Sequence, residues 1–210
     1  ELIHCSNLFH IPQQARLAEK LCVASGLKKA FFCNSGAEAN EAALKLARKW
    51  GKLQRGGAGE IIVAAHSFHG RTMGALSATA QSKYQEAFQP LVPGFRTVPF
   101  GDFPALAGAI GPQTAAVMLE PLQGEGGVHP APAGYLEAVR QLTIKENLLF
   151  ILDEVQTGLG RTGKMFAWQH WGARPDVLTL AKALGGGVPI GAMLAGKRAA
   201  ETFVPGDHAS

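Results

Sequence analysis

The sequence predicts an α/β fold, with a mostly parallel sheet covered by helices on both faces. Short apolar runs alternate along the chain with longer segments of helical periodicity. The runs are apolar throughout, as expected of strands buried on both faces. The 26 glycines gather at the ends of these runs, where strands turn into loops, and this distribution favours the same class.

Apolar runs bounded by polar or glycine-rich residues define the expected strands. A further segment, residues 90–104, is interrupted by prolines and is expected to be a surface connection with room for one strand. The expected strands are residues 29–33, 60–65, 115–119, 148–152, 177–181 and 191–195.

Helical spacing of apolar residues defines the segments between them. Pro12 suits the first turn of a helix over residues 12–24. A second helix is expected over residues 36–50, and a third over residues 134–146, with a short helical piece after Gly70. The apolar face of the second helix follows the i, i+3, i+4, i+7 pattern through Ala43, Leu46, Ala47 and Trp50.

Length and composition allow one large domain with a packed core. The chain has 210 residues, of which 47% are hydrophobic and 17% charged, and we expect residues 1–210 to be a fragment of a longer protein. It starts at Glu1 without a methionine and stops in a loop-like stretch, so both ends look cut.

Composition also argues against several classes of partner. The net charge of +4 is modest and no basic block carries interleaved aromatics, so nucleic-acid binding is not expected. No apolar run approaches the ~20 residues of a membrane span, and no signal peptide is evident. The scattered cysteines Cys5, Cys22 and Cys33 lack metal-binding spacing and suggest reduced thiols, which favours a cytoplasmic location.

Polar or glycine-rich clusters follow five of the expected strands. The carboxyl ends of parallel strands share one edge of a sheet, and ligands bind beyond that edge. We therefore expect a single site there. The clusters are residues 34–36, 66–71, 120–125, 153–156 and 182–187.

Asp153 and Lys182 are the most informative members of these clusters, because each follows an apolar run directly. A lysine at such a position can form an imine with an aldehyde and carry a proton. A buried aspartate can keep a pyridine nitrogen protonated, and Gln156 could then bond the ring hydroxyl. The pair is what pyridoxal phosphate requires. A solvated lysine, and an aspartate that caps a loop or pairs with an arginine, are the alternatives.

Ser35, Gly36 and Ala37 join an expected strand to an expected helix. Backbone N–H groups at such a junction can bind a phosphate. Ser35 and Glu38 also fit an ordinary capping box, so both interpretations stay open.

Other side chains of the clusters admit two interpretations each. Phe68 could stack on an aromatic ring or belong to the core. Arg71 suits a substrate carboxylate or a surface ion pair. His66 and His69 have no acid or cysteine partner at matching spacing, so no metal site is expected.

Two further motifs admit more than one interpretation. Glu120 and Glu125 flank a turn, where a glutamate could contact a substrate amine, hold an arginine, or be structural. Residues 158–163 match the dinucleotide pattern G-x-G-x-x-G. No acid lies ~20 residues further on to contact a ribose, so a nicotinamide site is not expected.

Taken together, the clusters resemble the class III aminotransferases, pyridoxal phosphate enzymes of the aspartate-aminotransferase fold (fold type I). The matching segments follow the family's order and span nearly the whole chain. They are residues 32–42, 68–72, 120–127, 153–158, 160–163 and 180–187.

The resemblance implies a role for each matching residue. Lys182 and Asp153 would be catalytic, Lys182 as the imine lysine that moves the proton and Asp153 as the partner of the ring nitrogen. The implied cofactor-binding residues are Ser35, Gly36, Ala37, Phe68, Asp153, Glu154, Val155, Gln156 and Lys182. The implied substrate-binding residues are Arg71, Glu125 and Ser210.

The resemblance is greatest to the subgroup that uses N2-acetylornithine, and this implies a reaction. The amino group would pass to 2-oxoglutarate, giving N-acetylglutamate 5-semialdehyde and glutamate, as in arginine biosynthesis, in a homodimer. The alternatives are class members acting on ornithine, succinylornithine or 4-aminobutyrate, and an aminomutase that needs no keto acid. A non-enzymatic module would be expected to lack Lys182 or Asp153. The family's threonine after Ser210, its amino-terminal segment and its small carboxyl-terminal domain are absent, so this chain alone is expected to be incomplete or inactive.

Overall fold

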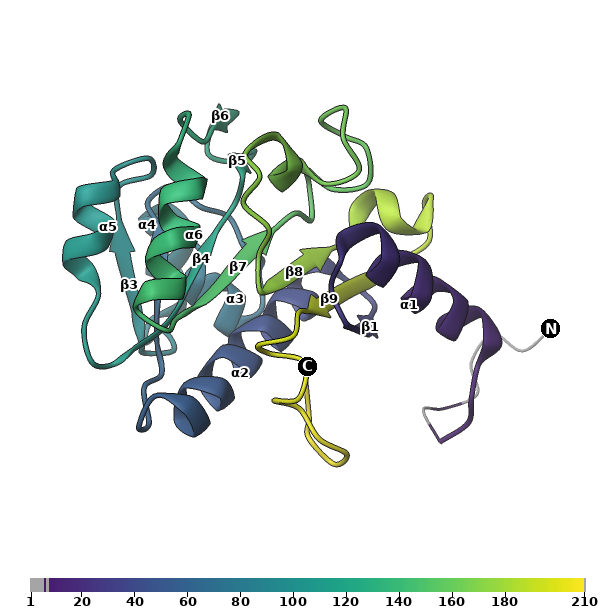
Figure 1. Cartoon of the computed structure of the whole chain (residues 1–210). Helices are drawn as coiled ribbons and strands as arrows, with labels where there is room; N and C mark the ends of the chain where they lie inside the picture. The colour runs from purple at the N-terminus through teal and green to yellow at the C-terminus, as the bar shows by residue number, and fades with distance from the viewer. Residues whose placement is uncertain (1–5, 7, 210) are drawn as a thin grey trace.

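The structure is a computed structural model that describes residue 6 and residues 8–209. In this part of the chain seven strands form one sheet, in the order β1-β9-β8-β7-β4-β2-β3 (Figure 1). β9 is antiparallel to both of its neighbours, and the other neighbouring pairs are parallel. The expected mostly parallel α/β fold is confirmed. The strands are β1 (Lys29–Cys33), β2 (Glu60–Ala64), β3 (Phe95–Val98), β4 (Thr114–Leu119), β7 (Leu149–Asp153), β8 (Val177–Leu180) and β9 (Gly191–Ala195).

The direction of the strands brings five loops to one edge of the sheet. Because β9 reverses direction, β1 on its far side points the same way as β8. The carboxyl ends of β1, β2, β4, β7 and β8 therefore share an edge. The five polar clusters predicted from the sequence follow these five strands.

Helices cover both faces of the sheet, as expected. α1 (Pro12–Ser25), α5 (Phe103–Ala109) and α6 (Tyr135–Lys145) pack on one face, and α2 (Gly36–Gln54) and α3 (Met73–Ala78) on the other. In Figure 1, α5 and α6 lie in front of the sheet and α2 runs behind it.

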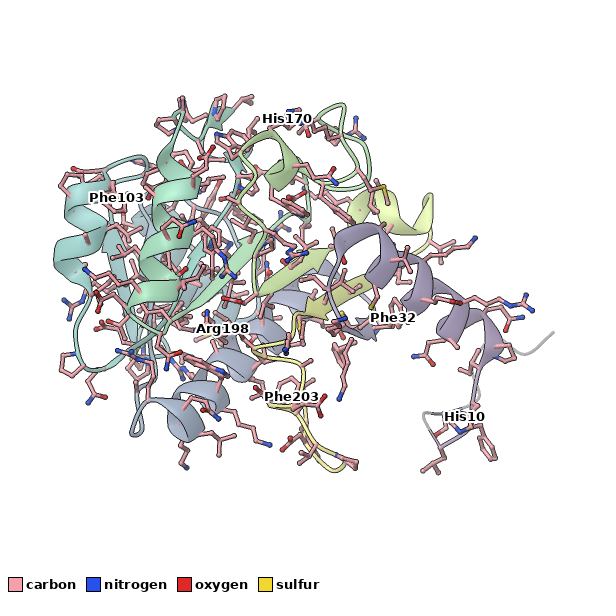
Figure 2. All side chains as sticks on the ribbon, in the orientation of Figure 1. His10, Phe32, Phe103, His170, Arg198 and Phe203 are labelled. Atoms are coloured by element: carbon pink, nitrogen blue, oxygen red, sulfur yellow. The ribbon has the colours of Figure 1, made fainter. Side chains whose placement is uncertain are left out.

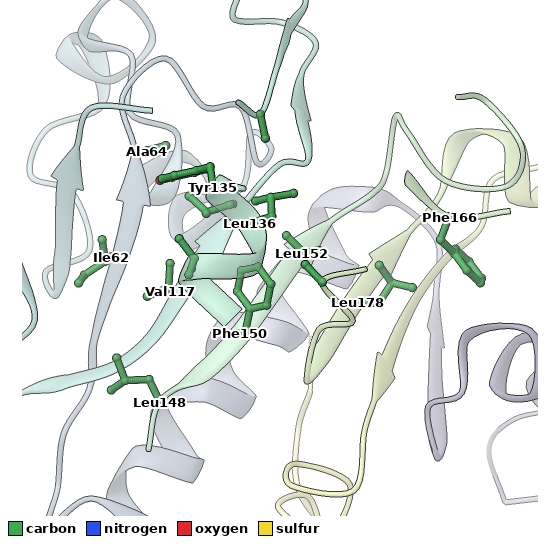
Figure 3. Close-up of a cluster of buried hydrophobic side chains, with 14 of the residues drawn as sticks. Ile62, Ala64, Val117, Tyr135, Leu136, Leu148, Phe150, Leu152, Phe166 and Leu178 are labelled. Atoms are coloured by element: carbon green, nitrogen blue, oxygen red, sulfur yellow. The ribbon is translucent and has the colours of Figure 1, made fainter. Parts of the chain in front are cut away.

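A hydrophobic core lies on each face of the sheet. Alternate residues of each strand belong to one core or the other, because successive side chains along a strand point to opposite faces. Phe150 and Leu152 of β7 belong to the core under α6, while Leu149 and Ile151 belong to the core under α2. Figure 3 shows Phe150 and Leu152 among the side chains gathered around Leu136 of α6.

At the opposite edge of the sheet, a buried ion cluster joins the start of β7 to the start of β8. Asp176 accepts hydrogen bonds from Arg140 Nη1 at 2.7 Å, from Arg198 Nη1 at 3.0 Å and from Phe150 N at 3.0 Å. Figure 2 labels Arg198 near this end of the sheet. Each partner offsets the cost of burying the Asp176 carboxylate.

One segment differs from expectation. Residues 90–104 contain β3, the one strand that the expectation allowed. Pro104, however, does not belong to a surface connection. It lies in the first turn of α5. Backbone N–H groups in a first helical turn have no acceptor within the helix, so a proline, which has no N–H, loses no hydrogen bond there. Asp102 caps this helix by accepting from Ala105 N at 2.8 Å, and the fully buried Leu106 anchors it to the core.

The shorter elements were not predicted from the sequence. The hairpin of β5 and β6 and the short helices have too few residues for a periodic pattern to show. They are α4 (Ser82–Gln85), η1 (Glu86–Phe88), β5 (Leu122–Gln123), β6 (His129–Pro130), η2 (Ala167–His170) and η3 (Lys182–Gly185). None of the helices in the described part of the chain has the length and hydropathy of a membrane-spanning segment.

The packing of α2 against the sheet gives a test of the fold. A Cβ atom at Gly51 would collide with the carbonyl oxygen of Ala58 and lie 2.7 Å from Ala115 Cβ. Gly51→Ala is expected to lower the free energy of unfolding by about 1–3 kcal/mol through overpacking. Gly108→Ala in α5 is the matched control, because nothing lies within 4 Å of its Cβ position. Thermal unfolding of both variants checks this, and equal melting temperatures would contradict the packing.

Candidate functional site

A cavity of about 520 Å³ opens at the shared carboxyl edge of the sheet. All five strand-end clusters contribute to its walls, together with the residues that lead into β9. The single site expected at this edge thus corresponds to one cavity. Its lining residues are Asn34, Ser35, Gly36, Ala37, Asn40, Phe68, His69, Gly70, Arg71, Glu120, Leu122, Glu125, Asp153, Val155, Gln156, Ala181, Lys182, Gly187, Val188, Pro189 and Ile190.

Asp153 is the last residue of β7 and its carboxylate is held in the wall of the cavity. Only 5% of the residue is exposed. Its Oδ2 atom accepts from Asn40 Nδ2 and from His69 Nδ1, both at 2.8 Å, and its Oδ1 atom accepts from Val155 N at 3.0 Å. Donors from three separate segments therefore compensate for the loss of water around this acid.

His69 is fully buried beside Asp153. Burial alone would lower the pKa of its imidazole, but the hydrogen bond and the negative charge of Asp153 outweigh burial, and Glu120 adds to them. The net result is a raised pKa. Because a carboxylate oxygen only accepts, Nδ1 of His69 carries the proton in this contact.

Lys182 follows β8 by two residues and faces the same cavity. Its φ of 37° lies in the left-handed region, which costs a residue with a Cβ atom about 1–3 kcal/mol. The preceding Ala181 is buried and packs near Gly36, so the chain has little freedom before it turns. The lysine side chain is exposed, in contrast to the buried Asp153.

The start of α2 forms another wall, and both interpretations of Ser35 and Glu38 have support there. Ser35 Oγ accepts from Glu38 N at 3.2 Å, as an N-cap does. The Glu38 carboxylate turns back to Asn34, accepting from its side chain and its N–H at 3.0 Å each. The side-chain bond from Asn34 is the main cause that lowers the pKa of Glu38.

The first backbone N–H groups of any helix have no acceptor within the helix. At the start of α2, Ser35 caps only the N–H of Glu38. A Cβ atom at Gly36 would lie 2.7 Å from Val155 Cγ1, so only glycine allows the helix start to approach the loop after β7 this closely. Gly36 and Ala37 both line the cavity, so an anion could reach their N–H groups.

Phe68 and Glu120 form the wall beyond β2 and β4. The half-buried Phe68 ring packs edge-to-face on Tyr84, with centroids 6.1 Å apart. Its N–H donates to Glu120 Oε1 at 2.9 Å. Glu120 is 5% exposed, and burial raises the pKa of its carboxyl to about 7.

The rim of the cavity carries the remaining predicted residues that line it. Gln156 Nε2 donates to Glu125 Oε1 at 3.2 Å, which joins the loops after β7 and β4. Glu125 and Arg71 are exposed. Ser210 lies outside the described residues, as does Cys5, while Cys22 and Cys33 are free thiols.

Comparison with known proteins identifies the family. A family model described as aminotransferase class-III matches residues 1–210. The chain belongs to the class III aminotransferases. The acetylornithine aminotransferase of Gloeobacter violaceus is 57% identical over 210 residues, which are 100% of this chain and 52% of that protein. The chain thus spans about half the length of the curated relatives it matches.

Solved aminotransferase structures share the fold. The ornithine aminotransferase from Toxoplasma gondii, in a structure with partial occupancy of PLP at its active site, has a TM-score of 0.92 and 36% identity. The match covers 98% of this chain and 50% of the Toxoplasma gondii chain. N-acetylornithine aminotransferase from Stenotrophomonas maltophilia K279a has a TM-score of 0.81 and 46% identity, covering 96% of this chain and 50% of that chain.

One predicted cofactor residue of this class III chain points elsewhere. Glu154 does not line the cavity; its carboxylate accepts from Ala167 N at 2.7 Å and from Trp168 N at 2.8 Å. Burial raises the pKa of this carboxyl to about 7. The side chain holds the loop after β7 onto the start of η2 and turns away from the site.

Two residues with central contacts were not predicted in these roles. The sequence places both residues in matching segments, and for His69 it raises only the question of a metal ligand. A signal for Asn40 was available, because it lies three residues before Ala43 on the apolar face of α2. A polar residue in such a stripe indicates a buried hydrogen bond. Among the described residues, no group of three or more His, Cys, Asp or Glu could hold a metal ion.

Glu154 gives this aminotransferase chain a measurable pH dependence. The folded chain retains the Glu154 proton up to about pH 7, whereas the carboxyl has an ordinary value of 4.5. Between these values the folded state binds more protons than the unfolded state, so stability falls as pH rises. The melting temperature of wild type is expected to fall relative to that of Glu154→Gln from pH about 4.5 to about 7.

Glu86→Gln on the exposed surface is the control for this comparison. It is expected to track wild type at every pH. Parallel melting curves for wild type and Glu154→Gln across the same window would contradict the buried state of Glu154.

Proposed function

We propose that the protein carrying this chain is a pyridoxal phosphate-dependent aminotransferase, and that residues 1–210 form its cofactor-binding large domain. The observation that carries the proposal is that Asp153 and Lys182, an anchored acid and an exposed amine, line one cavity at the carboxyl edge of the sheet. The reaction proposed is transfer of the amino group of N2-acetylornithine to 2-oxoglutarate, in arginine biosynthesis.

The environment of Asp153 fits the ring nitrogen of the cofactor. An ionised carboxylate offers about four acceptor positions, and protein donors occupy three of them. Oδ1 accepts only one of these bonds and can take the N–H of a protonated pyridine. When bound, pyridoxal phosphate supplies an aldehyde that reacts with amines and a ring that withdraws electrons from the reacting carbon.

The start of α2 fits the phosphate of the cofactor. The N–H groups of Gly36 and Ala37 supply donors at the positive end of a 19-residue helix. The Ser35 hydroxyl donates to Glu38 Oε2 at 2.8 Å and would bind the phosphate by rotating away from that carboxylate. Glu38 would repel an anion, but its carboxylate is turned back and held by Asn34. The two interpretations of this segment are therefore compatible.

The roles proposed for the remaining residues come from the family resemblance, and the positions of these residues are compatible with them. Lys182 Nζ would take up the proton that leaves one carbon during transamination and deliver it to another carbon. Phe68 would pack against the ring, and Gln156 would donate to the ring hydroxyl. Val155 closes the wall beside Gly36. Glu154 supports the cofactor loop from behind through its bonds to residues 167–168.

The choice of substrate rests on the rim of the cavity and on the relatives. Arg71 is exposed at the rim and suits a substrate carboxylate. Glu125, paired with Gln156, and Ser210 complete the proposed substrate contacts. The curated relatives that match at 52–57% identity over this chain carry the name acetylornithine aminotransferase.

We propose further that the protein works as a homodimer in the cytoplasm. The family resemblance implies a site between two subunits, and the scattered free cysteines fit a reducing compartment. Sedimentation of the full-length protein tests the first of these statements.

Lys182 provides the direct test of the cofactor. The full-length protein with pyridoxal phosphate is expected to show the visible absorbance of a lysine-bound cofactor, and Lys182→Ala to lose it. Loss of the proton carrier is also expected to lower kcat by about 10²–10⁴-fold. Lys164→Ala, in an exposed loop, is the control. An unchanged spectrum in Lys182→Ala would refute the assignment.

The amino donor is tested by initial rates. With 2-oxoglutarate as acceptor, N2-acetylornithine is expected to give a higher kcat/KM than ornithine, succinylornithine or 4-aminobutyrate. A higher value for any of these would move the protein to another member of the class. Turnover of an amino aldehyde without added 2-oxoglutarate would instead indicate an aminomutase.

A further inference from the structure

Asn40 links two walls of the cavity through one amide group. It lies in the second turn of α2 and is 1% exposed. Its Nδ2 atom is 2.8 Å from Asp153 Oδ2 and 2.6 Å from the carbonyl oxygen of His69. The two N–H bonds of the amide thus serve two segments that are far apart in the sequence.

The neighbours of Asn40 fix the orientation of its amide. The carboxylate of Asp153 and the carbonyl of His69 are both acceptors without a proton to donate here. Turning the amide over would place its oxygen against both of them, so the NH2 group must face Asp153. The Oδ1 atom of Asn40 is buried and finds no partner among the described residues.

Packing alone does not account for an asparagine at this position. The other buried residues of α2 are alanines, leucines, Trp50 and Gly51. Asparagine is a poorer helix former than any of the alanines or leucines and leaves one oxygen unpaired. An apolar residue would avoid both costs. The bond to Asp153 is the compensating interaction.

We propose that Asn40 is a positioning residue for the cofactor: it ties Asp153 to the loop of residues 66–71 and so keeps the carboxylate in place at the wall of the cavity for the cofactor ring. Asn40 acts through Asp153 and does not itself take part in the chemistry. This inference rests on the proposed function, because it assigns Asp153 to the ring nitrogen. It predicts that Asn40 sets the affinity for the cofactor.

Two substitutions in the full-length protein separate positioning from packing. Asn40→Leu keeps a similar volume but donates no hydrogen bond, and is expected to weaken the apparent affinity for pyridoxal phosphate by about tenfold at every pH. Asn40→Asp places a second carboxylate against Asp153. The two acids share one proton at low pH and repel each other once it is lost.

The affinity of Asn40→Asp is therefore expected to fall more steeply than that of wild type as pH rises from about 5 to about 8. The other titratable groups near Asp153 are His69, Glu120 and Glu154, and they are present in every variant. The pH dependence that wild type and Asn40→Leu have in common belongs to these groups, and only the additional slope of Asn40→Asp is counted. Asn147→Asp is the matched control, since Asn147 lies at the opposite edge of the sheet beside Arg198. It is expected to behave as wild type.

Equilibrium titration of the apoprotein with pyridoxal phosphate at several pH values decides the question. Affinity curves of Asn40→Asp and Asn40→Leu that run parallel to wild type and within twofold of it would overturn the positioning role. If Asn40→Asp does not fold, Asn40→Leu alone is decisive by its loss or retention of affinity. Failure of the wild-type protein to bind pyridoxal phosphate would instead refute the proposed function.

Discussion

The buried carboxylate of Asp153 is the constraint on which the site depends. An acid at the end of a central strand, cut off from water, destabilises the fold unless donors surround it. The donors come from α2 through Asn40, from the loop after β2 through His69, and from the following turn through the N–H of Val155. Satisfying one carboxylate therefore fixes three walls of the cavity.

The parallel sheet explains why these segments meet. Strands β2, β4, β7 and β8 run in one direction, and β1 joins them because β9 between them is reversed. The five polar clusters then emerge at the same edge. The opposite edge holds the bonds of Asp176 to Arg140 and Arg198, which tie the starts of the strands together and leave the carboxyl edge for binding.

Much of this arrangement could be predicted from the sequence, for physical reasons. Strands buried on both faces are apolar throughout, so runs such as residues 148–152 are visible without a structure. The lateral order of the strands is set by packing of distant segments and leaves no local pattern. The short helix α5 was missed because Pro104 was interpreted as a break, although a proline is favourable in a first helical turn.

The two adjacent acids at the end of β7 show where residue-level prediction stops. Asp153 and Glu154 are adjacent and were both expected at the cofactor, yet neighbouring side chains at a strand end point to opposite sides. Asp153 faces the cavity and Glu154 faces the N–H groups of residues 167–168. Which of two adjacent acids lines a site depends on which face of the strand each side chain occupies. The sequence motif contains both acids and does not distinguish them.

The most direct test of this account is the protonation state of the cofactor nitrogen. The full-length protein can be loaded with pyridoxal phosphate carrying ¹⁵N in its ring and studied by nitrogen NMR. In wild type the ring nitrogen is expected to have the chemical shift of a protonated pyridine at neutral pH, and in Asp153→Ala that of an unprotonated one. An unprotonated nitrogen in wild type, or the same shift in both proteins, would contradict the assignment of Asp153.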